Sequence, residues 1–140
     1  GQGGYMSSAN GKLIITANKL IVDAGDFDQV TDYFSEAYTV HVTGRSYEGG
    51  HKLVKKTIGD LRTTFSDLAT EIEILLVHES RVAWQRTYTG IQVRAYKGFP
   101  ATNKTMTWQD MVVSHIESGL IREEWLVTDL AEQLLRARKK

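Results

Sequence analysis

Apolar residues recur with two different spacings along this 140-residue chain. In the first half they return every three or four positions, which is the spacing of a helix with one buried face. Three such stripes are present, at Leu13–Ile21, Phe27–Phe34 and Leu53–Phe65. The first predicted helix ends at Gly25, and the second begins at Asp26, where the sequence resembles a capping box. The first half is therefore predicted to be mainly helical.

Polar and apolar residues alternate with a period of two in the second half, as they do in half-buried strands. The strands predicted from this alternation are Glu71–Leu75, Arg81–Gln92, Thr105–Ile116 and Leu120–Asp129. The run Tyr38–Val42 predicts one short strand between the second and third helices, and three leucines after Asp129 predict a last helical turn or two. This order predicts an α+β fold, in which helices cover one face of a curved antiparallel sheet.

Length and composition narrow the class of protein. The chain 1–140 has the size and the 41% hydrophobic content of one globular domain, and residues 1–5 are interpreted as a cloning remnant or a frayed terminus. Lys+Arg and Asp+Glu both number 17, and this balance argues against nucleic acid or an anionic membrane as a principal partner. No apolar run is long enough to span a bilayer and no signal peptide is visible, so we expect a cytoplasmic protein.

Metal and thiol chemistry are not indicated. The chain has no cysteine, which excludes thiol nucleophiles, disulfides and cysteine-ligated metals. Its four histidines, at positions 41, 51, 78 and 115, do not have the spacing of a metal-binding motif. We therefore expect no metal site.

Two segments of the second half resemble those of one family. They are Gly90 followed after seven residues by Gly98-Phe99-Pro100-Ala101-Thr102, and Ser118-Gly119-Leu120-Ile121-Arg122-Glu123-Glu124-Trp125. Their order and spacing resemble the SnoaL-like polyketide cyclases, of the nuclear transport factor 2 (NTF2)-like superfamily. The resemblance implies a cone, in which a strongly bent sheet wraps around helices and an apolar cavity, and a homodimer formed through the outer sheet face. It also implies intramolecular aldol chemistry on a small apolar or aromatic carbonyl compound, with no metal or other cofactor.

The chain departs from these cyclases at their reacting residues. Their key carboxylate directly follows the tryptophan of the last strand, and that position is Leu126 here. Their histidine on the preceding strand falls at Val112 by ungapped spacing, and another, two residues after the Gly90 position, is replaced by Gln92. We therefore expect the usual acid/base pair to be replaced by apolar residues.

Strand parity identifies other candidates for proton transfer. If Leu126 faces inward, the period of two places Glu124 and Arg122 on the same face. The neighbouring antiparallel strand then contributes Trp108, Asp110, Val112 and Ser114 to that face. Asp110 is therefore a candidate for a displaced general base. The alternative is that Asp110 and Glu124 form structural or interfacial ion pairs with Arg86 or Arg122.

Histidine and aromatic side chains complete the set of candidates. His41 lies in the predicted short strand, where this superfamily often places a polar pocket residue, and imidazole titrates near neutral pH. His41 is therefore either a proton carrier, together with Asp110 and Glu124, or a wall residue with satisfied hydrogen bonds. The aromatic side chains form either a pocket for a flat ligand or core and dimer contacts. The predicted pocket residues are Trp108, Val112, Leu126, Trp84, Tyr33 and Tyr38.

Three functions remain open on the sequence alone. The first is a cofactor-free enzyme that acts on a carbonyl compound with Asp110, His41 or Glu124 as proton carriers. The second is a non-catalytic module that binds a small molecule, and the third is a homodimeric domain that binds another protein through its sheet face. A closed cavity lined by carboxylates favours the first, a closed apolar cavity the second, and a filled cone the third.

Overall fold

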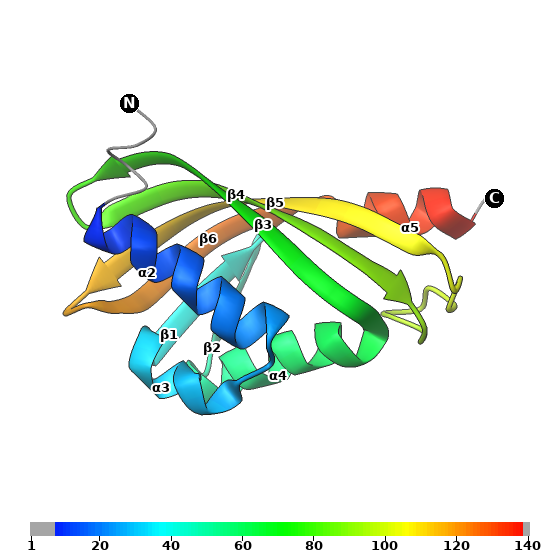
Figure 1. Cartoon of the computed structure of the whole chain (residues 1–140), viewed down its shortest axis with the longest axis horizontal. Coiled ribbons are helices and arrows are strands. Elements are labelled where there is room, and N and C mark those ends of the chain that lie inside the picture. Colours follow the sequence, from blue (N-terminus) through cyan, green and yellow to red (C-terminus); the bar gives the residue numbers. More distant parts are fainter. Residues whose placement is uncertain (1–7, 139–140) are drawn as a thin grey trace.

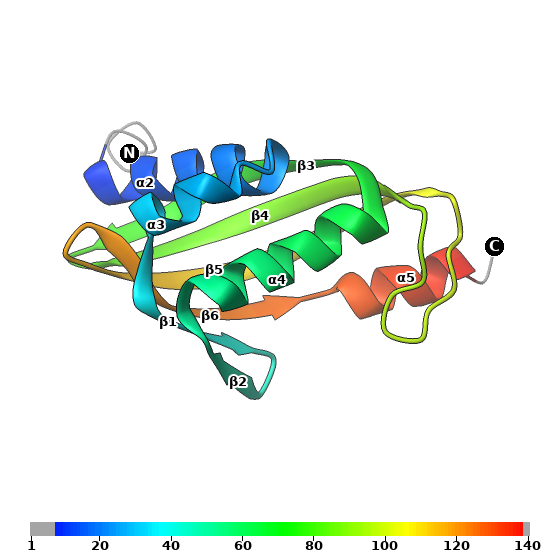
Figure 2. The ribbon, with the colours of Figure 1, turned by 90° about the horizontal axis from the view of Figure 1, so that it is seen from below.

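A computed structural model describes residues 8–138 of the chain. Within these residues six strands form one sheet in the order β2-β1-β6-β5-β4-β3, and α2, α3 and α4 lie on one side of it (Figures 1 and 2). The strands are β1 (Phe34–Val42), β2 (Arg45–Glu48), β3 (Phe65–His78), β4 (Arg81–Gln92), β5 (Thr105–Glu117) and β6 (Leu120–Thr128). The helical segments are α2 (Ala9–Ala17), the π-helix η1 (Asn18–Asp23), the 3₁₀-helix η2 (Phe27–Gln29), α3 (Val30–Tyr33), α4 (Gly50–Thr64) and α5 (Leu130–Arg138). The predicted α+β fold is confirmed.

The long central strands determine which side chains meet on the inner face of the sheet. All neighbouring strands are antiparallel except β1 and β6, which are parallel. Arg86 on β4 lies directly opposite Asp110 on β5, and Val112 on β5 lies directly opposite Leu126 on β6. Between residues 8 and 138 no helix is long and apolar enough to cross a membrane.

Two apolar clusters form the core between the helices and the sheet. The first packs Ile14 and Ile21, from the α2–η1 segment, against strand residues that include Trp84 and Val112. The second gathers Phe65, Tyr88, Met106, Trp108, Leu130 and Leu134, near the junction of β6 and α5. Because the two clusters lie at different positions along β4 and β5, the inner face has two apolar ends.

The second predicted helix is much shorter than expected. A 3₁₀ turn and a single turn of α-helix occupy residues 27–33, and Phe34 already has an extended backbone (φ −118°, ψ 142°). The side chain of Asp26 makes no capping hydrogen bond, so the predicted capping box is wrong. Strand β2 has no counterpart in the prediction because all four of its residues are exposed, which leaves no alternation to detect.

Strand β3 begins at Phe65, directly after α4 and six residues before the predicted start at Glu71. The backbone of Asp67 has a positive φ of 55°, and the pairing with β4 changes register between Ser66 and Ala69. This irregularity interrupts the alternation that would otherwise have indicated a strand. Phe65, which the sequence places on a helical stripe, packs instead on Trp108, with 4.4 Å between the ring centroids.

One glycine determines where α4 meets the sheet. Gly50, the first residue of α4, has a φ of +60°, and a Cβ atom at this position would collide with the carbonyl oxygen of Glu36 on β1. Only glycine combines that backbone conformation with so close an approach. Gly50 therefore allows α4 to begin against β1 and to cover the inner face of the sheet.

Candidate active site

A cavity of about 480 Å³ lies between α4 and the inner face of the sheet. Its wall combines apolar side chains with a few polar ones, and residues from η1, α4, α5 and strands β1, β4, β5 and β6 contribute to it. The exposed residues of the lining, which include Tyr47, Lys97 and Thr128, indicate that the cavity opens to solvent. The cone is therefore not filled by its own side chains.

The predicted parity of β5 agrees with the structure. Trp108, Asp110, Val112 and Ser114 are all buried, and the intervening residues Gln109 and Met111 are exposed. In addition to Asp110, five predicted site or pocket residues from four strands line the cavity: Tyr38, Trp84, Trp108, Glu124 and Leu126. The sheet thus brings together most of the residues that the sequence indicated.

Two predicted pocket residues do not reach the cavity. Val112 is buried, but it lies between Trp84 and Leu126 in the first core cluster, so these larger neighbours reach the cavity instead. Tyr33 ends the short helix α3 and packs against the same cluster outside the cavity lining. Its position follows from the early change to a strand at Phe34.

His41 points to the opposite face of the sheet. Its neighbours Val40 and Val42 line the cavity, so the alternation of β1 directs His41 outward. There its ring stacks on Trp125, with 5.3 Å between centroids. Its Nδ1 lies 2.7 Å from Ser46 Oγ and its Nε2 lies 2.6 Å from Glu123 Oε2. His41 is thus a hydrogen-bonded residue of the outer face and is not grouped with Asp110 and Glu124.

A bulge moves Arg122 away from its predicted position on the inner face. The pairing of β5 with β6 shifts register between His115 and Ile116, where Arg122 is left without a partner. As a result the buried residues Ile121 and Glu124 are three positions apart, not two or four. The Arg122 side chain donates to the carbonyl oxygen of Ala37, with 2.8 Å between Nη1 and the oxygen.

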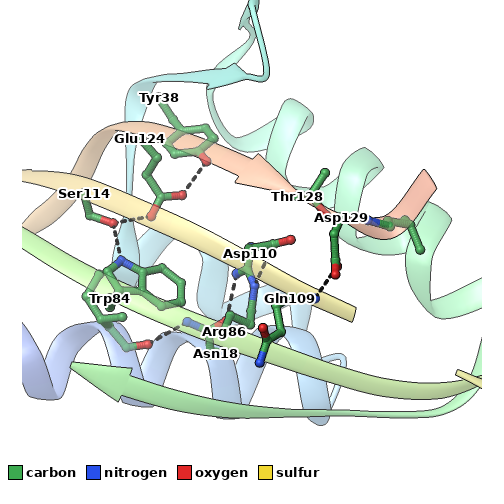
Figure 3. Close-up of polar contacts among 12 residues, drawn as sticks. Asn18, Tyr38, Trp84, Arg86, Gln109, Asp110, Ser114, Glu124, Thr128 and Asp129 are labelled. Carbon is green, nitrogen blue, oxygen red and sulfur yellow. Dashed lines mark hydrogen bonds and ion pairs between the residues drawn. The ribbon is translucent and has the colours of Figure 1, made fainter. Parts of the chain in front are cut away.

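Glu124 is a buried carboxylate held by two hydroxyl groups (Figure 3). The Tyr38 hydroxyl donates to Oε1 at 2.6 Å, and the Ser114 hydroxyl donates to Oε2 at 2.5 Å. The indole N–H of Trp84 donates to Ser114 Oγ at 2.8 Å and so fixes the direction of the serine hydroxyl. Burial, and then the negative charge of Glu124, raise the pKa of Tyr38 well above its ordinary value, so Tyr38 remains a donor. Among the described residues, Glu124 forms no ion pair.

Asp110 is held by a cation, unlike Glu124. Arg86 Nη2 lies 2.7 Å and Arg86 Nε 3.1 Å from Asp110 Oδ2, and Arg86 Nη1 donates to Asn18 Oδ1 at 3.0 Å (Figure 3). The guanidinium carbon lies 5.0 Å from the ring centroid of Trp84 and 4.8 Å from that of Tyr88. Burial alone would lower the pKa of Arg86, but Tyr88, Asp110 and Glu124 together raise it. The ion pair considered for Asp110 is therefore present.

Asn18 belongs to this polar cluster but was not among the predicted site residues. It is the first residue of the π-helix η1, is buried, and lines the cavity. Its Nδ2 donates to the carbonyl oxygen of Ile14 at 2.9 Å, which leaves its Oδ1 to accept from Arg86. The available signal in the sequence is a polar residue inside an apolar helical stripe, and π-helical turns often occur at functional sites. Within residues 8–138, no group of three or more His, Asp or Glu side chains is placed to hold a metal ion.

Comparison with known proteins identifies the family. The family model of the SnoaL-like polyketide cyclases matches residues 12–136. No curated protein matches the sequence. A proposed polyketide cyclase from Acidithiobacillus ferrooxidans is similar in structure, with a TM-score of 0.84 and 21% identity over 95% of this chain and 96% of that chain.

Two Streptomyces proteins have similar structures. IdmH from Streptomyces antibioticus, a proposed polyketide cyclase, has a TM-score of 0.80 at 14% identity, covering 94% of this chain and 99% of its own. AclR from Streptomyces galilaeus, a proposed hydroxylase, has a TM-score of 0.78 at 19% identity, covering 94% and 96%. These structural similarities confirm the NTF2-like cone. Because the family model also matches nearly the whole sequence, the chain belongs to the SnoaL-like polyketide cyclase family.

Proposed function

We propose that this protein is a cofactor-independent enzyme that removes a proton from a carbon made acidic by a carbonyl group, either directly beside it or across a conjugated ring, in a flat, apolar or aromatic compound. The observation that carries this proposal is the environment of Glu124. Its carboxylate lines the cavity and accepts hydrogen bonds from two neutral hydroxyls, with no ion-pair partner among the described residues. A carboxylate that no cation neutralises is a suitable general base, and the hydroxyls of Tyr38 and Ser114 orient it.

The proposed reaction is an intramolecular aldol cyclisation. Glu124 accepts the proton as the C–H bond breaks, and the electron pair of that bond forms an enolate with its charge on the carbonyl oxygen. The enolate carbon then attacks a second carbonyl carbon of the same molecule, and a C–C bond forms. The resulting alkoxide takes the proton back from Glu124. Atoms and electrons balance without an oxidant or a reductant, and the cavity contributes by holding the two reacting carbons close together.

Asp110 has a different role in this proposal, because it holds Arg86 in place at the cavity wall. The charged groups deep in the cavity lining are Asp110, Glu124 and Arg86, with two negative charges and one positive charge, whereas the other charged lining residues, Lys56, Asp60 and Lys97, are exposed to solvent. A ligand that carries its own negative charge would be repelled by this balance. We therefore propose a neutral ligand, and we assign no part in the reaction to His41, which lies on the outer face.

A non-catalytic binding module is the second candidate. Val112 and Leu126, which occupy the positions where the resemblance implies an acid/base pair, lie directly opposite each other and are apolar. A family member that binds its ligand without chemistry would have this substitution pattern. The open cavity argues against the third candidate, a filled cone that only binds other proteins.

Proton exchange on a carbonyl compound separates these two candidates. Anthrone is a suitable probe because it is flat, uncharged and small enough for a cavity of about 480 Å³, and its acidic C10 protons lie across the ring from its carbonyl oxygen. In D₂O under nitrogen, the wild-type protein should accelerate the loss of the C10 proton signal in a saturable manner, as followed by NMR. Saturable binding of anthrone with exchange at the rate of buffer alone would favour the binding module.

We also propose that the protein is a homodimer formed through the outer face of its sheet. Met111 and Val127 lie directly opposite each other on that face and are 45% and 54% exposed. Trp125 and Val113 form the next pair along the same two strands. Apolar residues grouped in this way on one face support an interface with a second copy.

A further inference from the structure

Two buried hydrogen-bond donors at the cavity wall have no partner among residues 8–138. They are the hydroxyl of Tyr88, a side chain that is 2% exposed, and the indole N–H of Trp108, which is 1% exposed. In this part of the chain, every fully buried polar side-chain atom has a hydrogen-bond partner. The Tyr88 hydroxyl and the Trp108 N–H, which have no such partner, must therefore be accessible to solvent or a ligand. Because both side chains are deeply buried and both line the cavity, they can be reached only from the cavity.

The other deeply placed donors of the lining are already engaged. The Tyr38 hydroxyl donates to Glu124, and the Trp84 indole donates to Ser114. Each nitrogen of the Arg86 guanidinium donates to an oxygen of Asp110 or Asn18. Among these deeply placed donors, only those of Tyr88 and Trp108 therefore have no partner within residues 8–138. A buried polar group without a partner in the protein indicates a place for a ligand or for water.

Packing holds both rings in place. Tyr88 on β4 lies directly opposite Trp108 on β5, and their rings stack with 4.8 Å between centroids and 17° between planes. The Arg86 guanidinium lies over the Tyr88 ring, and Phe65 packs on Trp108. Donors that are fixed in this way lose little conformational freedom when a ligand binds. Burial, together with the nearby Asp110 and Glu124 charges, raises the pKa of Tyr88 against the opposing effect of Arg86, so its hydroxyl stays protonated.

The donors and the proposed base lie at different ends of the inner face. Ser114, which holds Glu124, and Trp108 are six residues apart on β5, and Asp110 with its Arg86 partner lies between them. Glu124 hydrogen-bonds Tyr38 of the first core cluster, whereas Tyr88 and Trp108 belong to the second. A ligand that reaches both groups must therefore present its acidic carbon and its oxygen on opposite edges.

We propose that Tyr88 and Trp108 form a donor pair that receives a carbonyl or phenol oxygen of the ligand, at the end of the cavity away from Glu124. This inference rests on the proposed function, because it assigns the substrate an oxygen acceptor across the ring system from its acidic carbon. When Glu124 takes the proton, negative charge moves to that oxygen. Fixed donors aimed at a developing oxyanion stabilise it more than they stabilise the neutral carbonyl.

The test compares two ligands that differ in one oxygen. Anthrone and 9,10-dihydroanthracene share the same three rings, but only anthrone has the carbonyl group. Their affinities for wild-type and Tyr88→Phe protein can be measured by displacement of the fluorescent dye N-phenyl-1-naphthylamine. Tyr88→Phe should weaken anthrone binding about fivefold, the loss of one hydrogen bond, and should leave dihydroanthracene within about twofold. Tyr33→Phe, which removes a hydroxyl outside the cavity lining, is the matched control and should change neither affinity.

Each other outcome has a definite meaning. Equal anthrone affinity in wild type and Tyr88→Phe would overturn the donor pair, and so would an equal loss of affinity for both ligands, because that result indicates altered packing. Wild-type protein that binds neither ligand would overturn the inference together with the proposed function. If Tyr88→Phe selectively weakens anthrone while the wild type does not accelerate C10 exchange, the donor pair stands and only the enzymatic part of the proposed function fails.

Discussion

Replacing Asp110 with asparagine should destabilise the fold by about 3 kcal/mol, although the two side chains have almost the same shape. The Asp110 and Arg86 side chains are only 6% and 13% exposed, and two guanidinium nitrogens donate to the same carboxylate oxygen. Removing one partner of a buried ion pair typically costs about 3–5 kcal/mol, because the other charge is left without compensation. We expect the lower end of that range, since Glu124 also attracts the guanidinium and asparagine retains an acceptor oxygen.

Urea unfolding at pH 7, followed by tryptophan fluorescence, measures this change as the free energy of unfolding, provided that the m-value stays constant. Glu124→Gln is the matched control. It also replaces a buried carboxylate with an amide, but no ion pair is lost, so it should cost about 1 kcal/mol. The double variant should lose about 1 kcal/mol more than the sum of the two single losses, because Arg86 would then have no counter-charge nearby.

A free energy of unfolding for Asp110→Asn that lies within about 1 kcal/mol of the wild-type value, at an unchanged m-value, would refute this reasoning. Such a result would mean that solvent screens the Arg86–Asp110 pair as it does an exposed pair. A loss for Glu124→Gln as large as that for Asp110→Asn would refute the distinction between the two carboxylates.

Three further predictions concern alkaline stability, the α4 junction and the outer sheet face. Because the pKa of Tyr38 is raised in the folded state, Tyr38 should lower the stability above about pH 10 by up to about 1.4 kcal/mol per pH unit, as the unfolded state loses the proton first. Urea unfolding between pH 9 and 11 should show a shallower decline for Tyr38→Phe, and an identical slope would contradict this origin. Gly50→Ala should lower the free energy of unfolding by at least about 2 kcal/mol, whereas Gly119→Ala, which also has a positive φ but open space around it, should cost less. Val127→Lys should convert the proposed dimer to a monomer in light scattering, and a wild-type monomer would exclude that interface.

The sequence predicted the long strands and the inward row of β5 because the alternation there is regular. Asp110 and Val112 lie where parity placed them, and Val112 lies opposite Leu126 as the ungapped spacing required. The Arg86–Asp110 pair was one of two stated alternatives for Asp110. Cross-strand neighbours follow from register, so these parts of the site needed no tertiary information.

The rest of the site depends on features that carry no periodic signal. The bulge in β6 reversed the parity of Arg122, because a single extra residue exchanges the two faces of a strand. His41 was assigned from the resemblance, whereas the parity of β1, which was not applied to it, points it outward. Asn18 was missed because its one signal is a polar residue inside an apolar helical stripe, and the π-helical turn that directs it toward Arg86 has no clear sequence signature. The partners of Glu124 come from β1 and β5, and only the folded sheet brings Tyr38 to a carboxylate 86 residues away.

The role of Glu124 as the general base can be tested by comparing the rate of C10 proton exchange of anthrone in D₂O between wild-type and Glu124→Gln protein. Glu124→Gln should lower the protein-catalysed rate by at least about a hundredfold, the usual contribution of a general base, while anthrone affinity should change by less than about threefold. Exchange by Glu124→Gln at the wild-type rate would show that another group removes the proton, and the assignment of Glu124 as the base would be wrong.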